Sequence, residues 1–361
     1  MLSAVTAMGT ASAAPPAPPL FPIEVAGKHG MIDKNGAVVI PPEYAEPIVY
    51  RDGLARVARG SKVAYLDASG AFAIQPQDAA REPFAEGLTP AVGRDAAGKV
   101  AWGYIDTSGR FAIAPAFAEA RPFSEGLAQV GMTDQWGELR YGYADRTGKL
   151  VVPAKYQGKT FPFSAGLARV EVDKRLRVVN RQGADVTPDG IDFIGIASEG
   201  LYRVWSGRKQ GWMDGTGRVV IAPQFEQARE FSDGLAAVWV AGKYGYVDKS
   251  GAMVIPAKFD VAEDFADGRA VVKVGDKYGY IDKTGALVIP ATLDRAMKFS
   301  EGLAAARLDK HYGYVDPAGK WTISPRFAWV RPFTNGLAWV GEPGARGAYI
   351  DPTGRVVWAS K

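Results

Sequence analysis

Residues 234–256 carry the pattern that repeats along this chain, and they read Gly-Leu-Ala-Ala-Val-Trp-Val-Ala-Gly-Lys-Tyr-Gly-Tyr-Val-Asp-Lys-Ser-Gly-Ala-Met-Val-Ile-Pro. Three short runs rich in Val, Ile, Tyr and Ala are separated by Ala-Gly-Lys and by Lys-Ser-Gly. Such runs between glycine-containing turns are typical of β-strands joined by tight hairpins. No part of the chain keeps a 3.6-residue apolar period long enough for a helix. We therefore predict strands over 235–238, 244–248 and 252–255, with Pro256 ending the third.

Two markers of this segment recur about every 34 residues, which is the signature of a tandem repeat. The first is a turn of the form D-x-x-G, and the second is a glycine that is usually followed by Leu. The first marker begins at Asp33, Asp67, Asp106, Asp145, Asn180, Asp214, Asp248, Asp282, Asp316 and Asp351. The second marker is at Gly53, Gly87, Gly126, Gly166, Gly200, Gly234, Gly268, Gly302 and Gly336. The sequence thus predicts ten units, in which the Asp carboxylate bonds to the backbone of its own turn.

The stretch from Gly242 to Asp248, continued to Ile255-Pro256, resembles the bacterial WG repeat, also called the KWG repeat. The resemblance returns at Gly275–Pro290 and covers essentially Ile23 to Val357. Tyr is more frequent than Trp in the aromatic positions of the motif. The resemblance implies a repeat architecture and says little about activity, because few such repeats have a characterised function.

Each unit is expected to be a three-stranded antiparallel sheet that buries its apolar side against its neighbours. The first and last units already hold all three strands, so neither needs a strand from the other end. An open β-solenoid or superhelix is therefore favoured, with a closed propeller-like ring as the alternative. The predicted organisation is a signal peptide at 1–14, a Pro-rich linker at 15–22 and ten repeats at 23–361, with a degenerate repeat at 167–200. The aromatic positions that recur in nearly every unit are expected to form the core.

The N-terminal segment favours export to the periplasm or the medium. Residues 1–14 are small and apolar, and Ala11-Ser12-Ala13 resembles a signal-peptidase site. No Lys or Arg precedes the apolar stretch, so a truncated signal peptide and a disordered tail both fit this segment. No run approaches the roughly 18 apolar residues of a membrane span. The chain has no Cys, which excludes disulfides and thiolate chemistry.

Composition and motifs argue against nucleic-acid binding and against catalysis. The 43 basic and 39 acidic residues give a net charge of only +4, without a concentrated basic face. The two histidines, His29 and His311, lie in distant units, and no P-loop, nucleophile elbow or metal-spaced His pair occurs. We expect a non-enzymatic protein that needs no cofactor and no metal.

Candidate partner-binding residues come from positions that vary between units. Alternation along the first strand of each unit places one set of variable residues on the face opposite the small, inward residues. Exposed Trp and Arg together are typical of protein-binding hot spots and of sugar stacking. This set consists of Arg169, Arg203, Trp205 and Trp239.

Two further sets come from irregular units. The third and fourth units each carry five extra residues in the first hairpin loop, and insertions in repeat proteins commonly mark the binding face. These loops contribute Arg94, Asp95, Lys99, Asp134 and Trp136. The degenerate fifth unit contributes the basic residues Lys174, Arg175 and Arg177, and it is expected to be a weak link in the array.

Together these features predict an exported binding scaffold that mediates protein–protein interaction in the cell envelope. The alternative is a repeat protein that binds carbohydrate or peptidoglycan through exposed Trp and Tyr.

Overall fold

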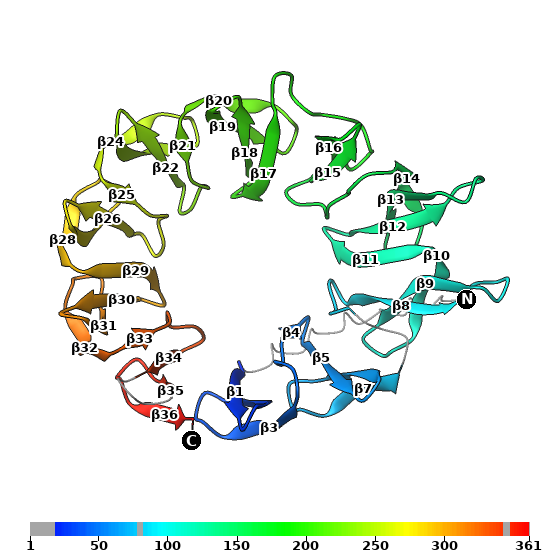
Figure 1. Ribbon diagram of the computed structural model, residues 1–361, viewed down its shortest axis with the longest axis horizontal. Coiled ribbons are helices and arrows are strands. Elements are labelled where there is room, and N and C mark those ends of the chain that lie inside the picture. Colours follow the sequence, from blue (N-terminus) through cyan, green and yellow to red (C-terminus); the bar gives the residue numbers. More distant parts are fainter. Residues whose placement is uncertain (1–18, 78–81, 342–346, 361) are drawn as a thin grey trace, which may run out of the picture.

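The structure is a computed structural model that describes residues 19–77, 82–341 and 347–360. Within these residues the chain forms thirty-six strands and no helix, organised as ten separate antiparallel sheets. The sheets follow one another in chain order around a central opening, and the first and last sheets lie side by side (Figure 1). We number the sheets as units one to ten. The predicted all-β array of tandem antiparallel units is confirmed.

The strands of the first five units differ in number. Unit one holds β1 (Phe21–Val25), β2 (Lys28–Ile32) and β3 (Val38–Tyr44), and unit two holds β4 (Tyr50–Arg51), β5 (Leu54–Arg59), β6 (Lys62–Leu66) and β7 (Phe72–Gln77). Unit three holds β8 (Leu88–Arg94), β9 (Val100–Asp106) and β10 (Phe111–Phe117), and unit four holds β11 (Glu119–Ser124), β12 (Leu127–Thr133), β13 (Leu139–Asp145) and β14 (Leu150–Tyr156). Unit five holds only β15 (Leu167–Val172) and β16 (Arg175–Asn180).

The last five units all have four strands. Unit six holds β17 (Phe193–Ser198), β18 (Leu201–Ser206), β19 (Lys209–Asp214) and β20 (Val219–Phe225), and unit seven holds β21 (Gln227–Ala228), β22 (Leu235–Val240), β23 (Lys243–Asp248) and β24 (Met253–Phe259). Unit eight holds β25 (Val261–Ala262), β26 (Ala270–Val274), β27 (Lys277–Ile281) and β28 (Leu287–Leu293), and unit nine holds β29 (Arg295–Ser300), β30 (Leu303–Leu308), β31 (His311–Val315) and β32 (Trp321–Phe327). Unit ten holds β33 (Trp329–Val330), β34 (Ala338–Gly341), β35 (Gly347–Ile350) and β36 (Val356–Ala359).

The prediction of three strands per unit is wrong for eight of the ten units, since seven have four strands and unit five has two. The additional strand is the innermost one and comes from the stretch expected to be a polar connection. In unit eight it is the two-residue β25, whose Val261 and Ala262 pair with Lys273 and Val272. A strand this short shows no alternation in the sequence, so its pattern could not reveal it.

The third predicted strand of each unit also runs further than expected. In unit seven β24 continues through Pro256 to Phe259, because a register shift between the pairs Tyr246–Ile255 and Tyr244–Phe259 accommodates the proline. Gly245 makes this possible, since a Cβ placed there would lie 2.5 Å from the carbonyl oxygen of Ile255. The central glycine of the motif is therefore required by close backbone contact within the sheet.

The core lies between neighbouring units and is built from the recurrent aromatic residues, as predicted. Tyr246 of unit seven is fully buried, and its ring centroid is 4.9 Å from that of Phe265 in unit eight, in an edge-to-face arrangement. Its hydroxyl donates to the carbonyl of Glu263 in unit eight at 2.7 Å. The same hydroxyl-to-carbonyl bond is made by Tyr65, Tyr104, Tyr143, Tyr280 and Tyr314. One tyrosine side chain thus joins each of these six units to the next unit.

A second inter-unit bond runs through the residue before each second-marker glycine. Asp233 and Gly234 both have positive φ, at 52° and 84°, and form a tight turn. The Asp233 carboxylate accepts the N–H of Gly268 in the next unit at 2.9 Å. Equivalent bonds join Asp52 to Gly87, Glu86 to Gly126, Glu125 to Gly166, Glu199 to Gly234, Asp267 to Gly302 and Glu301 to Gly336. Ala165 stands in this position in unit five and interrupts the series.

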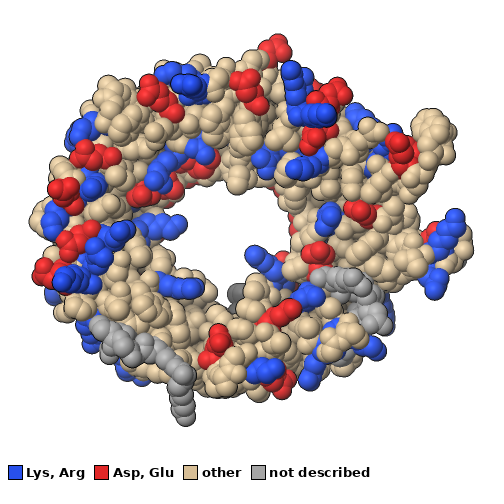
Figure 2. All heavy atoms as spheres, viewed as in Figure 1, with Lys and Arg blue, Asp and Glu red and all other residues tan. Residues whose placement is uncertain are grey.

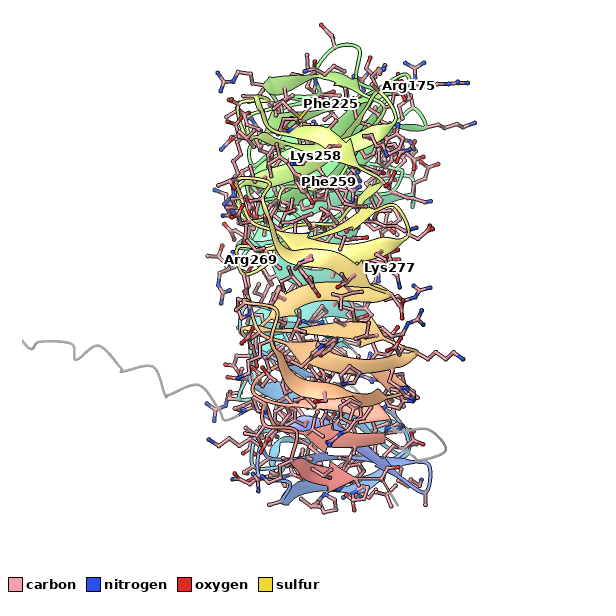
Figure 3. All side chains as sticks on the ribbon, turned by 90° about the vertical axis from the view of Figure 1, so that its left-hand side faces the viewer. Arg175, Phe225, Lys258, Phe259, Arg269 and Lys277 are labelled. Carbon is pink, nitrogen blue, oxygen red and sulfur yellow. The ribbon has the colours of Figure 1, made fainter. Side chains whose placement is uncertain are left out.

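The second-marker turns and the first hairpins lie on opposite faces of the array. Figure 3 shows Arg269, beside the Gly268 turn, on one face and Lys277, at the first hairpin of the same unit, on the other. Arg175, at the first hairpin of unit five, projects on the same face as Lys277 (Figure 3). The face that carries the first hairpins is called the hairpin face below.

The two ends of the chain contact each other. Tyr349 of unit ten donates its hydroxyl to the carbonyl of Pro22 at 2.9 Å, and its ring packs edge-to-face on Phe21. Phe21, Ile23 and Ile32 of unit one form a single buried cluster with Leu337 and Tyr349. The predicted linker therefore ends earlier than expected, since Phe21 and Pro22 belong to β1. Among the described residues, no strand of unit one pairs with a strand of unit ten.

Candidate functional site

The predicted set of variable Arg and Trp residues is half-buried, and each member has contacts within the array. Arg203 lies over the Trp205 ring, with its guanidinium carbon 4.7 Å from the ring centroid, and it pairs with Glu230 of unit seven at 3.0 Å. Arg203 also donates to the carbonyl of Ala228. Burial raises the pKa of the Glu230 carboxyl, although the positive charge of Arg203 opposes this shift. These residues therefore contribute to the contact between units six and seven.

The other members of this set are distributed over neighbouring units. Trp205 packs edge-to-face on Phe193, and Arg169 lies 4.5 Å from the centroid of the Phe161 ring. Arg169 reaches the Ile194 carbonyl of unit six at 3.4 Å. Trp239 packs on Tyr244 within unit seven. The structure thus brings Arg169, Trp205 and Arg203 to neighbouring positions in units five and six, while Trp239 lies apart in the next unit.

The two inserted loops are extensions of the first hairpins of units three and four. Each tip is a further D-x-x-G turn, Asp95–Gly98 and Asp134–Gly137, in which the Asp carboxylate accepts two backbone N–H bonds at 2.8–2.9 Å. Both hairpins project outward from the array (Figure 1). Both turns have the D-x-x-G form of the first marker. The sequence therefore contained a signal for these hairpin tips, which we did not use when we described them as inserted loops.

The tip of the unit-four hairpin exposes a large aromatic residue. The side chain of Trp136 is 76% exposed, the highest value among the large exposed apolar residues of the described chain. Arg140 fixes the base of the tip by pairing with Asp134 at 3.1 Å and with Glu138 at 2.7 Å. Hydrogen bonds from the Glu138 N–H and from Arg140 outweigh desolvation and lower the pKa of the Asp134 carboxyl. The tip is thus held rigid while Trp136 stays in solvent.

The hairpin of unit five continues this series on the hairpin face. Lys174 and Arg175 are exposed at its tip, where Asp173 and Lys174 have φ of 51° and 61°. Because the unit has only two strands, grooves of about 680 and 630 Å³ flank it, and Lys174 and Arg177 line both. Arg177 lies 4.0 Å from Asp185, so part of this positive charge is compensated.

The hairpins of units three, four and five are equivalent elements of three successive units. Their exposed side chains include four cations and one indole, which we call the hairpin surface. It consists of Arg94, Lys99, Trp136, Lys174 and Arg175. Figure 2 shows the two projecting hairpins at the outer edge of the molecule, with basic side chains on one of them. The sequence singled out each of these residues in the third, fourth and fifth units, and the structure places them on the first hairpins of three successive sheets.

The described residues contain no cluster of three or more His, Cys, Asp or Glu residues arranged to hold a metal ion. His29 and His311 lie in β2 and β31, in units one and nine. Among the residues that the structure describes, no helix is long and apolar enough to cross a membrane. The arrangement offers side chains for binding along exposed hairpins and grooves.

The repeat identity follows from the sequence profile of the family described as the WG containing repeat. It matches residues 30–62, 102–136, 141–175, 211–244, 244–278, 278–310 and 312–342, which together make up more than half of the chain. The chain belongs to the WG-repeat family. Each of the seven matches in this WG-repeat protein begins at the motif glycine of its unit or one residue before it. At this glycine the backbone lies very close to the neighbouring strand.

No curated protein matches this WG-repeat protein in sequence. Solved structures with partial likeness include Hsv2p of Kluyveromyces lactis, with 10% identity and a TM-score of 0.33 over 65% of this chain and 92% of that one. A second is the extracellular domain of the putative one component system BT4673 from B. thetaiotaomicron, with 11% identity and a TM-score of 0.28 over 93% of this chain and 65% of that one. A third is the WD40 β propeller domain of Doa1, with 12% identity and a TM-score of 0.26 over 63% and 91%. Scores of this size carry no argument about fold or function.

Proposed function

We propose that this WG-repeat protein is an exported, non-enzymatic scaffold that binds another protein through the hairpin surface. The observation that supports this most directly is the exposure of Trp136 at the tip of a lengthened hairpin. Leaving an indole in water forgoes the burial energy of a large apolar side chain, about 25 cal/mol per Å². Such residues commonly become the buried anchors of protein interfaces.

Charge specifies the kind of partner that fits this surface. The hairpin surface combines the four cations Arg94, Lys99, Lys174 and Arg175. Of the acidic residues at these tips, Asp95 and Asp134 are engaged in their own turns, Glu138 pairs with Arg140, and Asp173 is exposed beside Lys174. A complementary partner surface is therefore acidic and offers an apolar pocket for Trp136. Complementary charge raises the association rate and excludes partners of the wrong sign.

The experiment is an affinity pull-down from the native envelope fraction with three forms of the protein. In the test form, the unit-four hairpin is shortened by replacing its tip with the Ala241-Gly242 turn of unit seven. In the matched control, the Ala241-Gly242 turn is replaced by the Asp309-Lys310 turn of unit nine, since both are two-residue turns with positive φ. We expect the control to retain the partner and the test form and Trp136→Ala to lose it. A partner retained by both altered forms would contradict the proposal.

Carbohydrate or peptidoglycan binding remains the competing proposal, and the same material tests it. Sugar stacking on the variable Trp residues predicts that peptidoglycan co-sediments with the protein and that Trp205→Ala combined with Trp239→Ala abolishes this. The edge-to-face contacts of Trp205 with Phe193 and of Trp239 with Tyr244 occupy part of each indole. We therefore favour the protein partner.

Export is proposed from residues 11–13, which lie outside the described residues. We expect protein recovered from the periplasm of a diderm host to begin near Ala14, because signal peptidase cleaves after small residues of the A-x-A type. Mass spectrometry of the intact protein measures this directly. A mature protein that retains Met1, expressed from its verified start, would contradict export by this route.

We infer further that the ten units form a closed, propeller-like ring in place of the open superhelix favoured by the sequence. One repeated contact supports this inference. The first-marker glycine of each unit packs on the outer strand of the unit before it, as Gly70 does on Ile40, Gly285 on Ile255 and Gly319 on Ile289. Gly36 of unit one lies against the backbone carbonyl of Val357 in unit ten, as Gly217 of unit six lies against that of Val186. The contact between the two ends thus resembles a contact between successive units.

A further inference from the structure

We propose that the junction between units ten and one is a binding site for an extended, acidic segment of a partner protein, which adds to β1 as the missing innermost strand. The inference rests on the proposed function, because it presumes a protein ligand. This site lies between units ten and one, whereas the hairpin surface lies on units three to five. It also binds its ligand in a different way, through the backbone of a strand edge.

Among the described residues, unit one has no innermost strand, and its sequence gives a reason. In the seven units with four strands, an Asp, Glu or Asn followed by Gly, both with positive φ, turns the innermost strand back onto the next strand, as Asp233 and Gly234 do in unit seven. Alignment of β1 with β22 through their pairing places Pro19 at the position of Gly234. The proline ring fixes φ near −65°, so this turn cannot form. Among the described residues, β1 is accordingly the edge of its sheet.

The open edge of β1 carries backbone groups whose equivalents in other units are hydrogen-bonded. In units four, six, eight, nine and ten, the carbonyl at one fixed position accepts an N–H from the innermost segment, and these carbonyls belong to Gly131, Trp205, Lys273, Arg307 and Gly341. The equivalent carbonyl in unit one is that of Glu24, and no described residue donates to it. Exposed edges of this kind bind extended peptides through main-chain hydrogen bonds.

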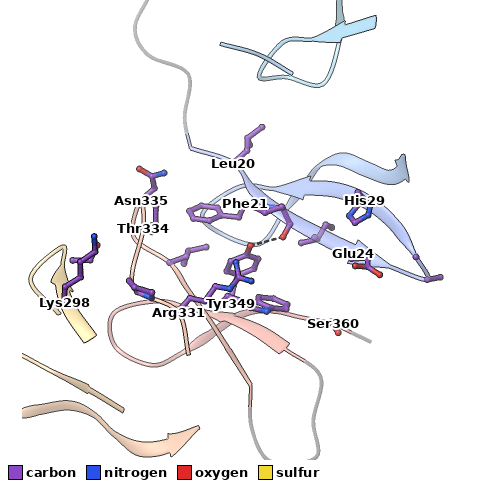
Figure 4. A pocket seen from close by; sticks show the side chains of 18 residues that line it. Leu20, Phe21, Glu24, His29, Lys298, Arg331, Thr334, Asn335, Tyr349 and Ser360 are labelled. Atoms are coloured by element: carbon purple, nitrogen blue, oxygen red, sulfur yellow. Dashed lines mark hydrogen bonds between the residues drawn. The ribbon is translucent and has the colours of Figure 1, made fainter. Parts of the chain in front are cut away.

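A cavity of about 980 Å³ lies at this edge (Figure 4). It is lined by Phe21, Glu24, Lys298, Arg331, Asn335 and Trp339, among others. The volume is typical of a ligand-binding pocket. Asn335 occupies the place from which acidic residues of other units accept the next glycine N–H, and Pro19 has no such N–H to give. An incoming peptide would supply it.

Tyr349 is placed to respond to such a peptide. In six other units the equivalent Tyr hydroxyl donates to a carbonyl of the innermost segment of the next unit, as Tyr314 does to Arg331 at 2.6 Å. At the junction it donates instead to the carbonyl of Pro22 in β1. Transfer of this bond to a peptide carbonyl would reproduce the arrangement of the other units and release Pro22 to accept a peptide N–H.

Charge selects an acidic peptide. Lys298 and Arg331 line the cavity, and neither forms an ion pair with any described residue. Glu24 is the one carboxylate among the lining residues. The innermost segment of unit eight, Asp260–Asp267, is itself acidic and reads Asp-Val-Ala-Glu-Asp-Phe-Ala-Asp. It therefore serves as a probe of both the shape and the charge of the site.

The test is fluorescence anisotropy of a labelled peptide with the sequence of residues 260–267, titrated with the full chain. We expect saturable binding, weakened at least tenfold by Lys298→Glu combined with Arg331→Glu. The matched control, Lys283→Glu combined with Lys310→Glu, makes the same charge change at exposed positions outside the cavity and should alter affinity less than twofold. Tyr349→Phe, which removes one hydroxyl, should weaken binding several-fold.

Three results would overturn the proposal. The first is absence of binding up to about 1 mM protein. The second is equal binding of a scrambled peptide, and the third is equal weakening by the two double variants. A chain without residues 1–13, in which the sequence of residues 259–268 replaces residues 14–19, provides a second test, since it should complete its own sheet and lose peptide binding. If the peptide binds but Trp136→Ala still captures the partner in the pull-down, this site is supported and the hairpin surface is refuted. If the peptide does not bind but Trp136→Ala loses the partner, the hairpin surface is supported and this site is refuted.

Discussion

At the scale of single residues, this WG-repeat protein depends on a few positions whose chemistry recurs in every unit. The Asp of each first-marker turn accepts hydrogen bonds from the backbone two and four residues later, as Asp248 does from Ser250 and Ala252 at 2.9 and 3.1 Å. The Ser250 hydroxyl donates to the same carboxylate. Because these bonds require the ionised form, the Ser250 hydroxyl and the turn N–H groups lower the pKa of Asp248.

These turns predict a loss of stability in acid. The pKa values of Asp67, Asp106, Asp145, Asp248 and Asp282 are all lowered, chiefly by the hydroxyl of the Ser or Thr in the same turn. A carboxyl with a lowered pKa in the folded state stabilises the fold above its unfolded-state pKa, and this stability is lost as pH falls through the folded value. We expect the thermal midpoint to be constant from pH 7 to about 5 and to fall below about pH 4. Circular dichroism melts in low-salt buffers measure it, and a midpoint unchanged at pH 3 would contradict the prediction.

The motif glycine predicts a second residue-scale effect. In Gly245→Ala the new methyl group would meet the carbonyl oxygen of Ile255 and the backbone nitrogen of Ala257, neither of which can move without disturbing the bulge. We expect a loss of about 3 kcal/mol in unfolding free energy. Gly242→Ala is the matched control, because its methyl group meets open space and adds only the cost of a positive φ, about 1–2 kcal/mol. Urea denaturation compares the two, and equal losses would show that close contact is not what requires Gly245.

At the scale of elements, the sequence revealed what depends on local pattern. The D-x-x-G turns, the hairpins and the alternation in β22, β23 and β24 were all visible, because their side chains repeat with the strand period. The two-residue β25 was not, since its pairing depends on contact with β26 and not on alternation. The candidate residues Trp205 and Trp239 were found as variable positions, but their partners Phe193 and Tyr244 depend on how the sheets pack.

Unit five is the element expected to open first. It has two strands, and apolar side chains next to it in unit six, Phe193 and Ile196, are 45% and 66% exposed. Fewer backbone bonds and less burial reduce local stability. In native-state hydrogen exchange we expect residues 167–200 to exchange faster than the equivalent residues 235–268. Equal protection would mean that unit five has changed its sequence while keeping its packing strength.

At the scale of the whole molecule, the contact between the two ends was the property that the sequence concealed. The reasoning from complete end units assumed that a ring is sealed by a shared strand. Here the ends meet through side chains, with Phe21 against Tyr349 and Leu337, and whether they reach each other depends on a small rotation accumulated over ten units. No local pattern reports that rotation.

The junction can be tested by weakening it. Phe21→Ala removes a buried ring from the cluster that joins the ends, and we expect it to cost about 3–5 kcal/mol. Phe193→Ala removes a ring that is 45% exposed in unit six and should cost less than half as much. Chemical denaturation gives both values. Small-angle scattering should also show a larger radius of gyration for the Phe21 variant under mild denaturant, and similar behaviour of the two variants would argue for independent ends.

The contact of Gly36 with Val357 has a consequence for how such a gene can change. Tandem repeats gain and lose copies by unequal recombination, and an open array would simply become longer or shorter by one unit. In the ring proposed here the final unit must arrive where the first one begins, so a chain with nine or eleven copies would have to alter the angle at every interface or leave its ends apart. Copy number should therefore be under far stronger selection than the sequence of any one unit, and drift of the kind seen in unit five is the form of variation that a ring tolerates.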